Sequence, residues 1–187
     1  MRPNKRDELV RNALQVFYRD GFHATGMDKL VAETGVSKTS MYKHFRTKED
    51  LILAALKLRD ESFREDFLHR ISEMSDTPAG QLLASFDALG EWFQQEEYRG
   101  CMFIKAGAEF QEKDHPIHKQ SAEHKQIMLD HFADLARRAG ARDPGNLACQ
   151  ILLLQEGAIV TAVFLKSCEP AREAKAAAQL LLDAALA

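Results

Sequence analysis

Three residues with reactive side chains, Cys101, Lys105 and Glu109, follow one another at four-residue spacing. On a helix this spacing places a thiol, an amine and a carboxylate on one face. The face could line a pocket that binds an anionic or carbonyl-bearing small molecule. It could also be an exposed surface with a Lys–Glu pair worth about 0.2–0.5 kcal/mol. The spacing therefore indicates a candidate ligand-binding face and leaves the surface pair open.

Cys101 follows Gly100 at the expected start of a helix, where the helix N-terminus favours the thiolate form. This position suggests a thiol that senses oxidants or electrophiles, and the alternative is a buried free cysteine acting as a small hydrophobic residue. The other cysteines are Cys149 and Cys168, and the sequence has no CxxC pair. Three unpaired cysteines argue against a disulfide framework and against a thiolate zinc site. We expect reduced thiols.

Several histidines raise the possibility of a metal site in a helical bundle. His124 and His131 lie two helical turns apart, about 10 Å, so they do not fit one four-ligand centre. Only His115 and His118, with Glu109, could converge across the break between two helices. We expect solvated or capping histidines instead, and we predict neither a metal nor a cofactor.

Hydrophobic residues recur at helical spacing throughout the chain, and no stretch alternates with the period of a strand. Glycine, proline and N-cap residues divide this pattern. Thr25 with Asp28, and Thr47 with Asp50, are candidate capping boxes, and Ser37 is a candidate cap. We predict an all-α protein of nine helices, at about residues 5–19, 25–35, 38–44, 47–74, 79–95, 100–111, 117–139, 144–167 and 171–186.

Two short predicted helices joined at residues 34–37 have the pattern of a helix-turn-helix. Gly35 permits the left-handed turn, and a small core is supplied by Leu30, Val31, Val36, Met41 and Phe45. The second helix would expose Lys38, Thr39, Ser40, Lys43 and His44, with Tyr42 partly exposed. None is acidic, whereas the other two cap sites have Asp at the third helical position. An acid there would repel phosphate, so its absence favours contact with DNA; an ordinary pair of surface helices is the alternative.

The charge is unevenly distributed along the chain. Residues 1–50 carry 10 Lys and Arg against 7 Asp and Glu, a net charge of +3, whereas residues 51–187 carry 15 against 21, a net charge of −6. Because phosphate attraction depends on local charge, this asymmetry suggests a basic module attached to an acidic body.

The segment from Ala13 to Leu51 resembles the TetR family of transcriptional regulators. The matching positions, in fixed order, are Phe17, Gly21-Phe22, Thr25, Leu30-Val31-Ala32, Thr34 to Ser37, Met41 to Phe45 and Lys48 to Leu51. The resemblance is specific over residues 5–55 and weak beyond them. It implies a homodimer of nine or ten helices per protomer, in which the third helix reads the major groove and the last two helices form a four-helix interface.

The resemblance also implies roles for single residues. Thr25 would bind a phosphate as the cap of the second helix, and Lys48 would clamp a phosphate at the start of the fourth. Tyr42 and His44 match positions that contact the DNA backbone, and Tyr42 could also touch a thymine methyl.

The remaining implied DNA contacts lie on the same helix or before the first one. Bases or nearby phosphates would be met by Lys38, Thr39, Ser40 and Lys43. Thr39 stands where the family often has Gly or Ala, so it could add a base contact or merely face the backbone. A minor-groove or phosphate arm would consist of Arg2, Lys5 and Arg6.

Residues 79–140 carry aromatic and methionine side chains at spacings that face the inside of a bundle. With the charged face described above, they define a candidate effector pocket formed by Trp92, Phe93, Cys101, Lys105, Glu109, Met128 and Phe132. Apolar residues at such spacings are core more often than ligand pocket, so core packing is the alternative.

Residues 144–186 carry long apolar stripes that are rich in small residues, more than one helix needs to cover its own core. The predicted dimer-interface residues are Ile151, Leu154, Ala158, Ala162, Leu180 and Leu181. Two helices from each protomer would give two-fold symmetry, which matches a palindromic operator. Packing within a single chain is the alternative.

The longest apolar runs fall short of the roughly 20 residues of a membrane span, and the N-terminus lacks the apolar core of a signal peptide. We therefore expect a cytoplasmic protein without a membrane contact. We predict two domains, a helix-turn-helix DNA-binding domain at residues 1–50 and an effector-binding and dimerisation domain at residues 51–187.

These features predict a ligand-responsive transcriptional regulator, in the manner of most family members a repressor. It would bind a palindromic double-stranded operator as a homodimer and be released by a small-molecule effector, with coupling through the long fourth helix. The alternatives are a thiol-based redox or electrophile sensor of the same fold that uses Cys101, and a metal-binding helical enzyme. No nucleophile, base and orienting residue occur at recognisable spacing, so we predict no catalytic residues and no enzyme activity.

Overall fold

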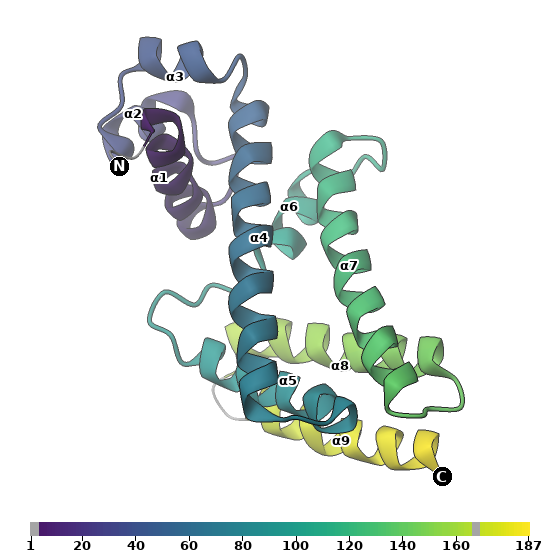
Figure 1. The fold of residues 1–187 in the computed structure, drawn as a ribbon. Coiled ribbons are helices and arrows are strands. Elements are labelled where there is room, and N and C mark those ends of the chain that lie inside the picture. Colours follow the sequence, from purple (N-terminus) through teal and green to yellow (C-terminus); the bar gives the residue numbers. More distant parts are fainter. Residues whose placement is uncertain (1–3, 166–168) are drawn as a thin grey trace. The chain divides into compact units, whose positions relative to one another are not determined.

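The structure is a computed structural model that describes residues 4–165 and 169–187, and over these residues it contains helices and no strand. The described residues form nine helices, labelled in Figure 1: α1 (Lys5–Asp20), α2 (Met27–Thr34), α3 (Lys38–His44), α4 (Lys48–Met74), α5 (Pro78–Phe93), α6 (Met102–Glu109), α7 (Pro116–Arg138), α8 (Pro144–Phe164) and α9 (Pro170–Leu186). The predicted all-α fold of nine helices is confirmed. Helix α6 is shorter than predicted, and the predicted end of α8 at residue 167 lies outside the described residues.

Side-chain caps fix several helix starts. Ser37 accepts a hydrogen bond from the backbone N–H of Ser40 (3.2 Å), as predicted. The capping box between Thr47 and Asp50 is also confirmed, because each side chain accepts the other residue's backbone N–H at 3.0 Å. The capping box predicted at Thr25 is wrong: α2 begins after Gly26 without a side-chain cap.

The first compact unit comprises residues 1–63, described from residue 4, and residues 102–124. It holds α1 to α3, the beginning of α4, α6 and the beginning of α7. Its core is apolar and closely packed, with Phe22 between Phe17 and Phe110 at ring-centroid distances of 5.5 and 6.1 Å. Leu30, Met41 and Phe45 are buried, as predicted, so the two short helices share a core with the rest of this unit.

The second compact unit comprises residues 64–101 and 125–187. Helix α9 packs against α8 and α5, and the core between these helices is mostly aliphatic. A buried polar contact that joins two of these helices is the 2.6 Å hydrogen bond from the Gln155 side chain to Ser85 Oγ. Because a buried amide must find a partner, this bond favours a single register between α5 and α8.

The boundary between these units differs from the predicted domain boundary at residue 50. The unit that contains the helix-turn-helix pattern also includes α4 as far as Phe63 and a later segment, Met102–His124. Residues distant in sequence therefore contribute to the surroundings of α1 to α3, a point that the pattern of residues 1–50 alone did not indicate.

Candidate functional site

Helix α3 is held at its start and on its inner face. Gly35 has φ +67°, in the left-handed region, and its N–H donates to Val31 O, which ends α2 and turns the chain. Met41 is completely buried and Phe45 is 6% exposed. These contacts fix the orientation of α3 and leave its other face to solvent.

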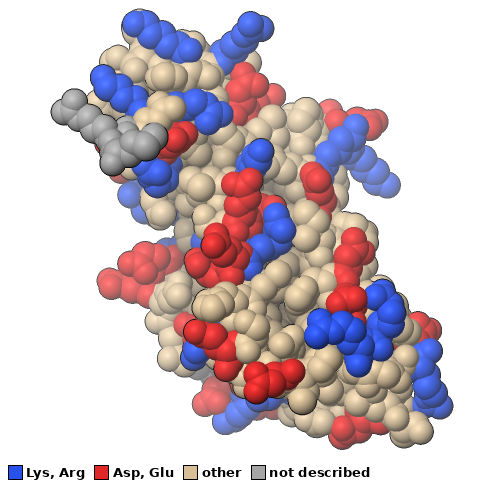
Figure 2. Space-filling view, in the orientation of Figure 1, with Lys and Arg blue, Asp and Glu red and all other residues tan. Residues whose placement is uncertain are grey.

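The outer face of α3 is polar and lacks acidic residues. Thr39, Tyr42, Lys43 and His44 are exposed, and Ser40 is half-buried. In Figures 1 and 2, α3 lies at the top, and Lys and Arg side chains gather on the outer edge of the first unit there. An exposed helix face with hydroxyl, phenol, imidazole and ammonium groups can donate hydrogen bonds to phosphates and to base edges.

The basic residues around α3 differ in their partners. Lys38 forms an exposed ion pair with Asp28 (2.9 Å), and the hydrogen bond to this carboxylate raises the pKa of Lys38. Lys43 and Arg46, by contrast, have no ion-pair partner among residues 4–165 and 169–187. Arg46 was not among the predicted residues, although its position directly after α3 and its charge were visible in the sequence. Lys43 and Arg46 are therefore the basic side chains most available to a phosphate.

Ion pairs also bind α1 to α2. Asp20 contacts Arg19 (2.7 Å) and Lys29 (3.0 Å), and hydrogen bonds from these two residues lower the pKa of Asp20. Arg19 also reaches Glu33 of α2 at 3.1 Å. These basic groups are therefore already paired with acids in the structure.

Three further residues predicted to contact DNA are placed differently from the expectation. Thr25 is completely buried and its hydroxyl donates to Gly21 O (2.7 Å), so its side chain has no surface to offer a phosphate. Lys48 is half-buried, and its Nζ donates to Phe22 O at 3.0 Å. Arg6 lies within α1 with its guanidinium over the ring of Phe45. Lys5 is exposed in α1, and Arg2 lies outside the described residues.

Helix α6 clamps the loop between α1 and α2. The carboxylate of Glu109 accepts the backbone N–H groups of Phe22 (3.0 Å) and His23 (2.5 Å), and Lys105 Nζ donates to Tyr18 O (3.0 Å) near the end of α1. Gly21 has φ +83°, and a Cβ at this position would lie 3.0 Å from Glu109 Oε1. The loop is therefore built closely around this carboxylate. We call Lys105 and Glu109 the α6 clamp.

The α6 clamp changes the interpretation of the predicted effector pocket. Lys105 and Glu109 belong to the first compact unit, where the backbone already engages both charges, whereas the other predicted pocket residues belong to the second. Four-residue spacing identified a shared face but could not show that its partner would be a backbone loop. The four predicted apolar residues are buried or half-buried, as expected for core: Trp92, Phe93, Met128 and Phe132.

Aromatic rings surround Tyr98 in the second unit. Trp92 and Phe93 lie 5.0 and 5.1 Å from it, measured between ring centroids, and its hydroxyl donates to Ile159 O at 2.7 Å. This contact of the half-buried phenol joins the segment after α5 to α8.

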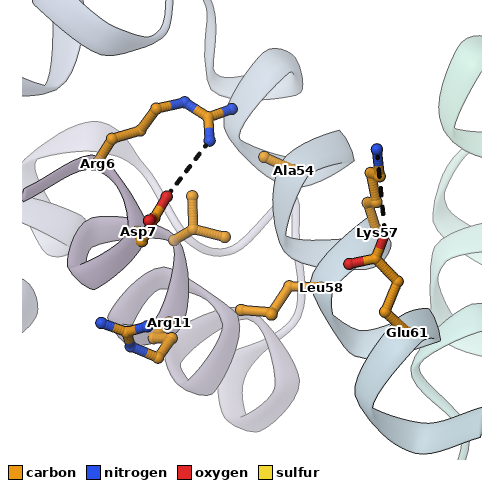
Figure 3. Close-up of a pocket in the computed structure, with 8 residues that line it drawn as sticks. Arg6, Asp7, Arg11, Ala54, Lys57, Leu58 and Glu61 are labelled. Atoms are coloured by element: carbon orange, nitrogen blue, oxygen red, sulfur yellow. Dashed lines mark ion pairs between the residues drawn. The ribbon is translucent and has the colours of Figure 1, made fainter. Parts of the chain in front are cut away.

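A groove of about 370 Å³ lies elsewhere, between α1 and α4 (Figure 3). It is lined by Arg6, Asp7, Val10, Arg11, Ala54, Lys57, Leu58 and Glu61. Neighbouring residues on the same helix form ion pairs, Arg6–Asp7 at 3.7 Å and Lys57–Glu61 at 4.0 Å. None of the predicted pocket residues lines this groove, and its charges are partly neutralised by one another.

The histidines considered above as possible metal ligands take part in separate contacts. His124 is buried, pairs with Asp60 (2.6 Å) and stacks on Phe103. His118 Nδ1 lies 2.9 Å from Phe110 O, and His115 stacks on the ring of Phe110. Among the described residues, no three His, Cys, Asp or Glu side chains are grouped so that they could hold a metal.

The surface of α8 and α9 corrects part of the predicted interface. Ile151 and Ala158 are buried in the protomer's own core, while Leu154, Ala162 and Leu181 are half-buried and Leu180 is 71% exposed. The largest exposed apolar side chains of α8 were not predicted: Leu153 (72%), Val160 (42%), Val163 (45%) and Phe164 (76%). Because α8 is apolar on all sides, spacing alone could not tell its core face from its outer face.

Helix α8 is also long and apolar enough to cross a membrane, by length and composition alone, with 33% of the relevant window buried. The core helix of a water-soluble protein passes the same test, and here one face of α8 packs against α5 and α9. Its composition is accounted for by one face in the core and one face that is open in the single chain.

Comparisons with known proteins agree on one family. The sequence profile described as "Bacterial regulatory proteins, tetR family" matches residues 9–55. The transcriptional regulator YjdC of Escherichia coli is 23% identical over 83% of this chain and 81% of its own length, and the transcriptional activator FasR of Mycolicibacterium smegmatis is 25% identical over 87% and 70%. A TetR-family transcriptional regulator from Streptomyces coelicolor has a similar crystal structure, with a TM-score of 0.90 and 27% identity over 97% of this chain and 96% of that one.

Proposed function

From the premise that this chain belongs to the TetR family of transcriptional regulators, we propose that it binds a palindromic operator as a homodimer and is released by a small-molecule effector. The family relationship supports DNA binding and regulation of transcription. The operator, the dimer and the effector response are the parts that this proposal adds. Repression is the proposed direction, although FasR, one of its relatives, is an activator.

The outer face of α3 is the observation that carries the proposal. Its exposed residues Thr39, Tyr42, Lys43 and His44 can all donate hydrogen bonds, and no acid lies on the helix. Buried Met41 and the Ser37 cap hold this face in one orientation. We assign base or phosphate contacts to these four residues and to Lys38, Ser40, Lys48 and Arg46. Lys38 would first have to leave Asp28, and Lys48 would have to leave the carbonyl oxygen of Phe22.

The homodimer is supported by the apolar surface of α8 and α9. Leu153, Val160 and Phe164 follow at seven- and four-residue spacing on one face of α8, and Leu180 is exposed on α9. A monomeric protein rarely leaves large apolar side chains grouped on its surface. A second copy of the same two helices would cover them and produce the two-fold symmetry that a palindromic operator requires.

The response to an effector is proposed as a shift between conformations that differ in the spacing of the two α3 helices. Both α4 and the α6 clamp could transmit it. Helix α4 extends from the unit that contains α3, and α6 holds the α1–α2 loop through Lys105 and Glu109. As a regulator that acts on DNA without chemical turnover, the protein is placed in the cytoplasm.

The experiment that tests this proposal selects genomic fragments with purified full-length protein and maps the bound site by footprinting. We expect a palindrome whose half-sites lie about one helical turn, or a multiple of it, apart. Analytical ultracentrifugation of the same sample should give a dimer. A monomer that binds no duplex at low salt would contradict the proposal.

A further inference from the structure

The groove between α1 and α4 brings charged side chains together over an apolar floor, within the first compact unit (Figure 3). The floor consists of buried Val10 and of half-buried Ala54 and Leu58. The volume of about 370 Å³ lies within the range of about 300–1,000 Å³ that is usual for small-molecule sites, which combine an apolar lining with a few polar groups. The groove is therefore large enough for a small organic molecule.

The charged side chains that line the groove are only loosely paired. Arg6 and Asp7 lie 3.7 Å apart, and Lys57 and Glu61 lie 4.0 Å apart, beyond the usual N–H···O hydrogen-bond range of about 2.7–3.2 Å. Arg11 has no ion-pair partner in the part of the chain that the structure describes. The N–H donors of these cations are therefore available to a ligand.

Positive charge is in excess in the groove. Three cationic side chains and two carboxylates line it, which leaves a net charge of +1. The cations come from both walls, because Arg6 belongs to α1 and Lys57 to α4. In Figure 3 the guanidinium of Arg6 extends from α1 toward α4. A guanidinium and an ammonium from opposite walls favour a carboxylate as the ligand's polar group.

From this charge and this floor we infer that the groove binds an organic anion with an apolar chain or ring, such as a medium-length carboxylate. The carboxylate accepts hydrogen bonds from Arg6 and Lys57. The apolar part of the ligand lies on the floor and is removed from water there.

Arg6 connects the groove to α3. Its guanidinium lies 4.9 Å from the centre of the ring of Phe45, the residue that ends α3. A carboxylate that binds Arg6 competes with this ring for the guanidinium and neutralises a positive charge beside the end of α3. Building on the proposed function, we expect the bound anion to weaken operator binding.

The binding part is tested with octanoate on the full-length protein. Methyl NMR spectra of protein labelled at alanine, valine and leucine should show saturable shifts at Val10, Ala54 and Leu58. Two related probes separate the contributions of chain and charge. Acetate lacks the chain and octylammonium has the opposite charge, so each should bind at least tenfold more weakly than octanoate.

Opposite substitutions on one wall distinguish a ligand site from a solvated surface. Lys57→Gln removes a cation and should weaken octanoate binding about fivefold, whereas Glu61→Gln removes a repelling carboxylate and should strengthen it several-fold. Lys113→Gln, in the loop after α6, is the control and should leave the affinity unchanged. All three residues are exposed, so the variants should fold like the wild type.

Four outcomes would overturn the site. They are the absence of a saturable shift in the groove, octylammonium binding as tightly as octanoate, equal effects of Lys57→Gln and Glu61→Gln, and shifts centred on exposed Leu153 and Val160 of α8. The last result would show that octanoate binds as an adventitious additive on another apolar surface.

The link to α3 is tested by operator binding at saturating octanoate, with the ionic strength matched by sodium chloride. We expect the wild-type protein to lose about fivefold in affinity and Arg6→Gln to lose none. Unchanged wild-type affinity with the groove fully occupied would overturn the link. If the protein binds no duplex at all, the proposed regulatory function fails instead, and the NMR titration still decides whether the groove binds an anion.

Discussion

Helices α3 and α8 depart from ordinary surfaces in opposite ways. Helix α3 has seven residues, one fully buried side chain and an outer face that is polar and free of acids. Helix α8 has 21 residues and leaves large apolar side chains such as Leu153 and Phe164 in solvent. The first departure suits a charged, hydrogen-bonding partner, and the second suits a partner that is itself apolar. This difference supports the proposal that α3 binds DNA and that α8 binds a second protomer.

The strongest test of this assignment places charges on α8. The double substitution Leu153→Glu/Phe164→Glu should raise the dimer dissociation constant about a thousandfold, roughly 4 kcal/mol, because two carboxylates would be buried between the copies. Sedimentation velocity over a concentration series measures the change. Gln94→Glu/Gln95→Glu adds the same charge to exposed positions after α5 and should leave the dimer intact. Equal dimerisation of both variants would remove α8 from the interface.

A second test removes the buried anchor of α3. Met41 is completely enclosed, so Met41→Ala should destabilise the first unit by about 3 kcal/mol through lost contacts and a cavity. Chemical denaturation monitored by circular dichroism reports the loss. Met27→Ala, at a half-buried position of α2, is the control and should cost less than about 1 kcal/mol. If the two variants are equally stable, α3 is not oriented by its inner face.

A third test asks how far α3 depends on the α6 clamp. Glu109→Ala leaves the N–H groups of Phe22 and His23 without their carboxylate acceptor and should cost about 1–2 kcal/mol, less than a fully buried pair because Glu109 is partly solvated. Hydrogen exchange at these two amides should accelerate. Glu112→Ala, exposed three residues later, is the matched control and should change neither quantity.

The smallest expected effect comes from a single substitution on the outer face of α3. Lys43→Ala should change stability by less than about 0.5 kcal/mol, yet lower the salt slope of operator binding by about one and weaken all sequences alike. Fluorescence anisotropy across a salt series measures both the slope and the affinity. The control is Lys113→Ala in the loop after α6, where the slope should stay the same. An unchanged slope for Lys43→Ala would leave this residue out of the phosphate contacts.

The sequence predicted a region well where local spacing separates its polar positions from its apolar ones. The caps at Ser37 and Thr47 and the core positions Leu30 and Met41 depend on local spacing, and the structure confirms them. Helix α8 is apolar all round, so its pattern could not distinguish buried Ile151 from exposed Leu153.

For some polar residues the sequence predicted the wrong partner. Their partners in the structure are backbone groups or lie far away in the sequence. Thr25 resembled a cap, but its hydroxyl donates to Gly21 O inside the core. Glu109 resembled a pocket residue, but its acceptors serve amides 86 and 87 residues away. The contacts of Lys125 with Cys101 and Glu156 could not be predicted from the sequence. These residues lie more than 20 positions apart, and only the fold brings them together.

The α6 clamp has a consequence for engineering chimeric regulators. A chimera that joins residues 1–50 to the body of a different family member would keep Gly21 and the α1–α2 loop but lose Glu109 and Lys105. The backbone N–H groups of Phe22 and His23, which precede α2 and α3, would then lack their carboxylate acceptor. The transferable module is therefore discontinuous: it includes α6 as well as the N-terminal helices, and a functional exchange needs both segments from the same parent.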